Sequence, residues 1–271
     1  MADILRQILA DKYEEVAASK RARPASALQD LADFHARPRD FFSAAATPRN
    51  TGPALIAEIK GRSPSAGVIR EPLHVAEIAI SYERAGAAAI SVLTDAKYFG
   101  GAPENLAIAK KACGLPVLRK EFIVDDYQIL ASRALGADAI LLIGEALPLG
   151  QILDFAHAAA TMGLAVLIEG HSADVLLPIV EGLRRQDRGG VLIGINNRDL
   201  TRQVTDLAIF ENVAAALGGD FPLVAESGLR NRMDVERVWA AGAASMLIGE
   251  AILQSSSLER MIQDLLGFSP Q

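Results

Sequence analysis

The chain has 271 residues, of which 51% are hydrophobic and 22% charged, and this is enough apolar material for one sizeable core. Its formal net charge of −6 excludes a general basic field that would attract nucleic acid, but leaves room for a local site that binds a small anion. A single cysteine, Cys113, excludes an intrachain disulfide framework and a thiolate metal cluster.

The first 50 residues have a helical character. Residues 1–20 are charged and lack the pattern of a signal peptide, and the apolar runs of the chain are too short for a membrane span, so we expect a cytoplasmic protein. The pattern predicts helices at 3–20 and 24–35, followed by an Arg- and Pro-rich connection at 37–40. Because so short a segment buries little core alone, we interpret 1–50 as an added helical extension.

From residue 54 onward, one phrase recurs: a helical segment, a glycine, then a short apolar run. It reads "RAGAAAISVL" at 84–93, "ALGADAILLI" at 134–143 and "AAGAASMLIG" at 240–249. Glycine suits the left-handed position that ends a helix, and the β-rich run after it is typical of a strand buried on both faces. The pattern predicts strands at 54–60, 89–94, 116–120, 138–143, 164–169, 191–196, 222–226 and 244–248.

Amphipathic helical patterns separate these strands, and the repeat has the size of a βα unit. Eight such units predict a closed parallel (β/α)8, or TIM, barrel over residues 51–271, so that residues 1–271 form one domain. An open doubly wound sheet is the alternative, but it usually has a Gly-rich first turn, and no G-x-G-x-x-G follows the first predicted strand.

Polar residues interrupt these strands at their carboxyl ends, where the active site of such a barrel lies. In "ALIAEIK", Glu58 and Lys60 are two residues apart and share the inward face, while Ile59 faces the helices. A lone charge at a strand end is more often a solvated loop residue, but several ionisable groups at one end indicate a catalytic site. Besides Glu58 and Lys60, the polar residues at the carboxyl ends of the predicted strands are Arg119, Lys120, Glu169, Asn196, Glu226 and Ser227.

The last two loops favour a phosphate site. "AESGL" supplies Ser227 and Gly228, and "LIGEAI" supplies Gly249 at the start of a helix. Glycine permits close approach of the backbone, and loops in these positions commonly bind phosphate in this fold, although tight turns alone could account for the glycines. The four histidines show no metal-ligand spacing, and aromatic residues beyond the strand ends either pack a lid or flank an aromatic substrate.

Taken together, these residues resemble the indole-3-glycerol phosphate synthase family of tryptophan biosynthesis. The resemblance is carried by "AEIKGRSPSAGVI", "SVLTDAKYFGG", "KEFIVDDYQI", "GINNRDL" and "AESGL", and covers about 54–252 in order. It implies a carboxy-lyase that converts 1-(o-carboxyphenylamino)-1-deoxyribulose 5-phosphate into indole-3-glycerol phosphate, carbon dioxide and water. It implies no cofactor and no metal. The anionic substrate is the expected partner; we expect a monomer or weak homo-oligomer, with no nucleic-acid or membrane partner.

The resemblance also implies roles for individual residues. Lys120 and Lys60 would be the acids, in an order that stays open, Glu169 the base, and Glu58 the group that orients the lysines. Asn196 and Glu226 would hold substrate hydroxyls or the anilino nitrogen, with Arg198 bracing them. The implied phosphate ligands are Ser63, Ser227, Gly228, Gly249 and Glu250, and the implied aryl pocket contains Pro64, Phe99, Phe122 and Leu141. Leu247, on the last predicted strand, is a further expected substrate-binding residue.

Three departures from the family pattern stand near the expected mouth. Gly170 replaces a β-branched residue after Glu169, and Gly144 and Glu145 replace a usually small apolar pair after the fourth predicted strand. The loop at 201–206 carries Arg202 and Gln203. These changes put rate, loop mobility and affinity in question more than reaction type.

Two other functions compete with the synthase. A related sugar-phosphate isomerase is expected to use a Cys and Asp pair, but Cys113 precedes a strand and lies at the wrong end of the barrel. A non-catalytic phosphate-binding barrel would be expected to lack some of the ionisable groups, all of which are present.

Overall fold

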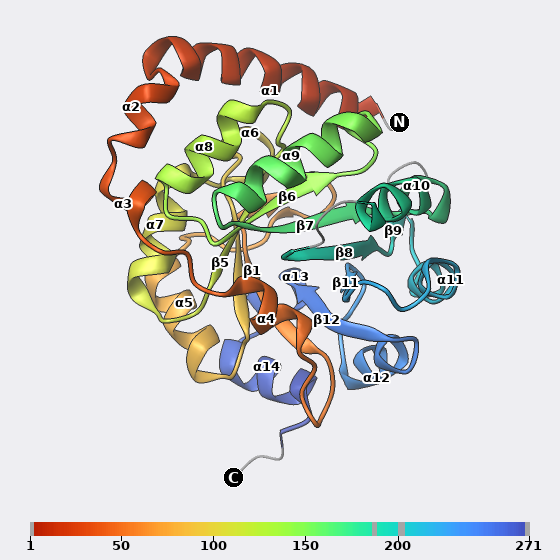
Figure 1. The fold of residues 1–271 in the computed structure, drawn as a ribbon. Helices are drawn as coiled ribbons and strands as arrows, with labels where there is room; N and C mark the ends of the chain where they lie inside the picture. The colour runs from red at the N-terminus through yellow and green to blue at the C-terminus, as the bar shows by residue number, and fades with distance from the viewer. Residues whose placement is uncertain (1–2, 186–188, 200–203, 269–271) are drawn as a thin grey trace.

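The computed structural model of the protein describes residues 3–185, 189–199 and 204–268. Eight parallel strands close into a barrel in the order β1-β12-β11-β8-β7-β6-β5-β4 (Figure 1). This confirms the predicted (β/α)8 barrel, and the strand ends agree with the predicted ranges to within one residue. The strands are β1 (Ala54–Ile59), β4 (Ala89–Leu93), β5 (Val117–Lys120), β6 (Ala139–Ile143), β7 (Ala165–Gly170), β8 (Val191–Asn196), β11 (Leu223–Glu226) and β12 (Ala243–Ile248).

Helices connect successive strands and surround the barrel (Figure 1). Four of the glycines that precede strands have positive φ angles, 95° at Gly86, 85° at Gly136, 73° at Gly163 and 98° at Gly242, as expected for residues that end a helix. The helices after β1 are α5 (Val75–Arg84), α6 (Ala96–Phe99), α7 (Pro103–Ala112), α8 (Asp126–Ala134), α9 (Leu149–Thr161), α10 (Ala173–Arg184), α11 (Ala208–Leu217), α12 (Arg232–Ala240), α13 (Glu250–Leu253) and α14 (Leu258–Leu266).

Two short ribbons lie in the loops after barrel strands. One pairs β2 (Arg62–Ser63) with β3 (Gly67–Val68), and the other pairs β9 (Arg198–Asp199) with β10 (Val204–Thr205). The first follows β1 and the second follows β8, so both belong to the carboxyl ends of the strands.

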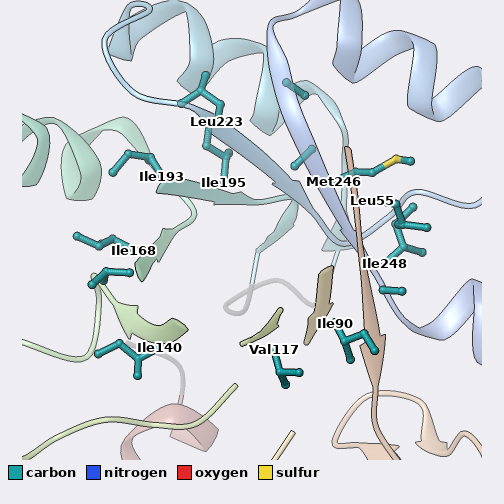
Figure 2. Packing of buried hydrophobic residues seen from close by; sticks show 14 of the residues in the cluster. Leu55, Ile90, Val117, Ile140, Ile168, Ile193, Ile195, Leu223, Met246 and Ile248 are labelled. Atoms are coloured by element: carbon teal, nitrogen blue, oxygen red, sulfur yellow. The ribbon is translucent and has the colours of Figure 1, made fainter. Parts of the chain in front are cut away.

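Alternate residues of each strand serve two different cores. In β1, Leu55, Ala57 and Ile59 belong to the outer core between strands and helices. Figure 2 shows this layer, with Ile90, Val117, Ile140 and Ile168 directed away from the barrel axis. Ile56 belongs instead to the interior cluster with side chains such as Leu118 and Leu192. The expectation that Ile59 faces the helices is therefore confirmed.

The amino-terminal extension covers both ends of the barrel. Helix α1 (Asp3–Ala22) lies beside α8, whereas α4 (Phe41–Ala46) packs into the interior cluster with Phe41 only 1% exposed (Figure 1). The single helix predicted at 24–35 is wrong: α2 (Ala25–Gln29) and α3 (Ala32–His35) are separate. Leu31 adopts an extended conformation between them, with ψ 138°, and packs in the apolar cluster shared with α1 and α8.

Candidate active site

One cavity of about 800 Å³ opens at the carboxyl ends of the barrel strands. Every residue to which the sequence resemblance assigns a catalytic or substrate-binding role lines it, whereas Arg119, the other basic residue at the end of a strand, does not. They are Glu58, Lys60, Ser63, Pro64, Phe99, Lys120, Phe122, Leu141, Glu169, Asn196, Arg198, Glu226, Ser227, Gly228, Leu247, Gly249 and Glu250.

Lys120, at the end of β5, lies at the centre of this group. Its Nζ donates to Oε2 of Glu169 at 2.6 Å and to Oε2 of Glu226 at 2.6 Å. Asn196 donates from Nδ2 to the other oxygen of Glu169 at 2.8 Å, and its own Oδ1 accepts from the backbone N–H of Arg198 at 3.0 Å. Side chains from four strands, β5, β7, β8 and β11, thus hold the Lys120 ammonium and the Glu169 carboxylate in fixed relative positions.

The protonation states follow from burial and from these neighbours. Burial opposes the charge on Lys120, but Glu169 and Glu226 outweigh it and raise the pKa of Lys120 above its ordinary value. Burial works against ionised Glu169 too, but Lys120 lowers the pKa of Glu169. For Glu226, burial and the charge on Glu169 together raise the pKa to about 8. At neutral pH the trio therefore holds a charged lysine, an ionised Glu169 and a largely protonated Glu226.

Glu226 occupies a space that a glycine leaves open. A Cβ on Gly194, in β8, would lie 2.2 Å from Oε1 of Glu226. That oxygen is buried and, among the residues that the structure describes, has no hydrogen-bond partner. A buried orphan polar atom is costly, so Oε1 is a site where a substrate group can bind or a proton can sit.

Glu58 and Lys60 form a second ion pair on the opposite side of the mouth, with Nζ and Oε1 2.6 Å apart. They share the inward side of β1, as their spacing predicts. Gly249 packs directly against this pair, because a Cβ there would lie 2.7 Å from Oε1 of Glu58. The interpretation that grouped Arg119 with the residues of the mouth is wrong. Arg119 points outward and donates to Ser132 Oγ at 3.1 Å, as alternation with inward-facing Lys120 requires.

The side of the cavity predicted to hold phosphate combines a strained turn with an arginine. Ser227 and Gly228 both have positive φ angles, 64° and 82°, and Ser227 is the only described non-glycine residue with one. Arg198 donates to Ser65 Oγ and lies 3.9 Å from Glu250, which links the loop after β8 to those after β1 and β12. The helix that begins at Glu250 is a single turn, so backbone N–H groups rather than a long helix dipole are the expected anion ligands.

The other side of the cavity is apolar. The rings of Phe99 and Phe122 are 5.9 Å apart with an interplanar angle of 36°. Three residues of α1, Ile4, Leu5 and Ile8, complete this wall. Sequence reasoning missed them: their spacing indicates a buried helix face, but nothing local indicates what the face covers.

The departures from the family pattern form a local unit beside Glu169. The carboxylate of Glu145 accepts from the backbone N–H of His171 at 2.9 Å and lies 2.6 Å from its Nδ1. Side chains of α10 pack down on Gly170, where a Cβ would meet Leu176 at 2.9 Å. Glu145 therefore holds the end of β7 where Gly170 removes a branched side chain. Arg202 and Gln203 lie outside the described residues.

Neither a metal site nor a membrane-spanning helix accompanies this cavity within the described residues. No group of three or more His, Cys, Asp and Glu side chains there is arranged to hold a metal ion, and no helix there has the length and apolar character needed to cross a membrane. Cys113 is buried at the end of α7, where its Sγ lies 3.5 Å from the Ala109 carbonyl oxygen, outside the cavity.

A closed parallel barrel with interlocked lysines and glutamates at the carboxyl ends of its strands defines a (β/α)8-barrel enzyme. The model of the indole-3-glycerol phosphate synthase family matches residues 5–265. The chain belongs to this family.

Similar proteins support the assignment over nearly the full length. The indole-3-glycerol phosphate synthase of Leptothrix cholodnii is 44% identical over 94% of this chain and 96% of its own length. That of Rhodospirillum rubrum is 42% identical over 98% of this chain and 100% of its own. Among solved structures, a thiamine phosphate pyrophosphorylase from Pyrococcus furiosus covers 81% of this chain and 96% of its own, with a TM-score of 0.55 and 13% identity. It shows the fold alone.

Proposed function

We propose that this chain is a carboxy-lyase that converts 1-(o-carboxyphenylamino)-1-deoxyribulose 5-phosphate into indole-3-glycerol phosphate, carbon dioxide and water, as a step of tryptophan biosynthesis. One observation carries the proposal: the Lys120 ammonium is held between Glu169 and Glu226 in a cavity that has an aromatic wall and an anion-binding turn. Family membership over residues 5–265 supports the choice of reaction.

The first step joins the aryl carbon that bears the carboxylate to the ketone carbon. The ketone oxygen gains negative charge as this bond forms and must take a proton. Lys120 remains protonated because two carboxylates surround it, so it can donate a hydrogen bond to this oxygen and then the proton. Carbon dioxide then leaves with the broken C–C bond, whose electron pair restores the aromatic ring.

The second step removes water from the ring just formed. The hydroxyl leaves with a proton from an acid, and a base takes the proton from the adjacent ring carbon to form the indole double bond. Glu169 suits the base because its lowered pKa keeps it ionised, and Asn196 fixes the position of its carboxylate. Lys60 or Lys120 provides the acid, and the 2.6 Å contact with Glu58 holds Lys60 toward the mouth.

The remaining cavity residues bind and orient the substrate. Phe99, Phe122, Pro64, Leu141 and Leu247 take the aryl ring, since apolar and aromatic surface binds such a ring best. Ser63, Ser227, Gly228, Gly249 and the Glu250 backbone take the phosphate. Glu226 and Asn196 bind the hydroxyls or the anilino nitrogen, and Arg198 braces the loops around them.

Incubating the purified protein with the carboxyphenylamino-deoxyribulose phosphate tests the proposal, because an indole product fluoresces differently from the substrate. We expect a steady fluorescence increase that is proportional to enzyme concentration. No signal at high enzyme concentration would refute the synthase assignment and leave a non-catalytic phosphate-binding barrel. A related sugar-phosphate isomerase is less favoured, because the only cysteine lies outside the cavity.

A further inference from the structure

A buried lysine of α1 connects the extension to the aryl side of the cavity. Lys12 is only 2% exposed, and its Nζ lies 3.1 Å from Asp95 Oδ2 and 3.0 Å from Glu121 Oε1. Both carboxylates are also buried, at 3% and 2% side-chain exposure. A third contact, at 2.7 Å, is with Glu15 at the surface.

Each buried carboxylate holds one of the two aromatic residues that form the aryl wall. Asp95 Oδ1 accepts from the backbone N–H of Phe99 at 3.3 Å and from that of Tyr98 at 2.7 Å, so it caps the short helix α6. Glu121 Oε1 accepts from the backbone N–H of Phe122 at 2.9 Å. Lys12 is therefore one contact away from the backbone of each ring-bearing residue.

The same helix supplies the roof over those rings. Leu5 and Ile8 line the cavity on the face of α1 that precedes Lys12 by one or two turns. A second attachment lies one residue before Lys12, where Asp11 accepts from Lys97 Nζ at 2.6 Å and from the Tyr98 hydroxyl. The loop after β4, the loop after β5 and α1 thus meet at one buried ammonium group.

From this geometry we infer that Lys12 is a positioning residue for recognition of the substrate's aryl ring, because it sets the spacing between Phe99 and Phe122 and the height of α1 above them. The inference rests on the proposed function, which supplies the aryl substrate. Lys12 is not among the residues that line the cavity, so it acts through Asp95 and through Glu121, which does line it.

Without Lys12, Glu121 would keep the Thr94 hydroxyl, at 2.6 Å, and Arg119, at 3.6 Å. The two buried carboxylates would lose the ammonium group that they share, and both would shift. Phe99 and Phe122 would move with them, while the phosphate turn at Ser227 and Gly228 belongs to another loop and would keep its shape. Small displacements of positioning groups have large effects on a bound ligand. The expected defect is therefore confined to the aryl half of the ligand.

The test compares two unreactive probes by calorimetry: the substrate with its ketone reduced to an alcohol, and ribitol 5-phosphate, which lacks the aryl group. In Lys12→Met, we expect the affinity for the aryl probe to fall by about tenfold or more, with KM rising in parallel and kcat changing far less. Affinity for ribitol 5-phosphate should change by less than about twofold. The matched control is Lys20→Met, also on α1, whose partly exposed pair with Asp125 is of little energetic consequence.

Equal weakening of both probes, or no weakening of either, would overturn the inference. If Lys12→Met does not fold, as judged by circular dichroism, Asp95→Asn takes its place, because an amide oxygen still caps α6 while the ion pair with Lys12 is lost. It must show the same selective loss of the aryl probe. A wild-type protein that neither turned over substrate nor bound the probes would refute the proposed function itself, whereas an active wild type with unselective variants refutes this inference alone.

Discussion

Replacing Glu226 by glutamine should change how the stability of the protein depends on pH. The pKa of Glu226 rises from an ordinary value of 4.5 to about 8, because the carboxyl is buried and faces Glu169. The unfolded chain therefore releases this proton at lower pH than the folded protein. The stability that neutral Glu226 gives is fully present below pH 4.5 and is lost as pH rises toward about 8.

The size of the effect follows from the difference between the two pKa values. At about 1.4 kcal/mol for each pH unit, the loss across the range is roughly 5 kcal/mol as an upper figure. Entry of water beside the newly ionised carboxylate relaxes part of it, so we expect about 2 kcal/mol or more. Glu169 has a lowered pKa and Lys120 a raised one, so both titrate outside this range.

The measurement is the free energy of unfolding in urea at pH 5, 6, 7 and 8, for the wild type and for Glu226→Gln. Glutamine keeps an oxygen that can accept from Lys120 but has no proton to lose. Relative to the wild type, the variant should gain stability steadily from pH 5 to pH 8, by about 2 kcal/mol or more. A difference between the two proteins that is constant across these pH values would refute the assignment of the raised pKa to Glu226.

Three further predictions follow from the site and the core. Lys120→Ala should leave the fold intact and lower turnover about 10²-fold or more, and near-normal turnover would remove Lys120 from the role of acid. Gly194→Ala should lower turnover by about tenfold or more, because its Cβ would lie 2.2 Å from Oε1 of Glu226. The control is Gly150→Ala, whose Cβ would meet nothing within 4 Å. Equal turnover in the two variants would contradict the packing argument. Phe41→Ala should lower the free energy of unfolding by about 3–5 kcal/mol with KM unchanged, because Phe41 fills the barrel interior far from the mouth; a change below about 1 kcal/mol would contradict that role.

The barrel could be predicted from the sequence because local signals coincide there. A glycine with a positive φ angle follows several of the helices and precedes a short apolar strand, as at Gly86 and Gly136, and this pair of signals locates the strand. Period-two alternation then placed Glu58 and Lys60 together on the inward face. The same rule should have placed Arg119 on the outer face, since it is adjacent to Lys120.

Other features depended on contacts between distant segments. No local pattern indicates that α4 fills the interior of the barrel or that α1 covers the aryl wall. The hydrophobic pattern of a buried helix face is the same whichever segment of the chain covers that face. The break between α2 and α3 at Leu31 also depends on a distant contact. Packing of Leu31 in the apolar cluster shared with α1 and α8 outweighs the helix propensity of this segment. The space that Gly194 leaves for Glu226 lies between neighbouring strands and has no signature along either one.

The measurement that tests the central claim most directly is the stoichiometry of products from substrate labelled with ¹³C in its carboxylate. The proposed reaction predicts that purified protein releases one labelled carbon dioxide for each indole ring formed, and that Lys120→Ala suppresses both products together. Conversion of the substrate without release of labelled carbon dioxide, or release without indole formation, would contradict it.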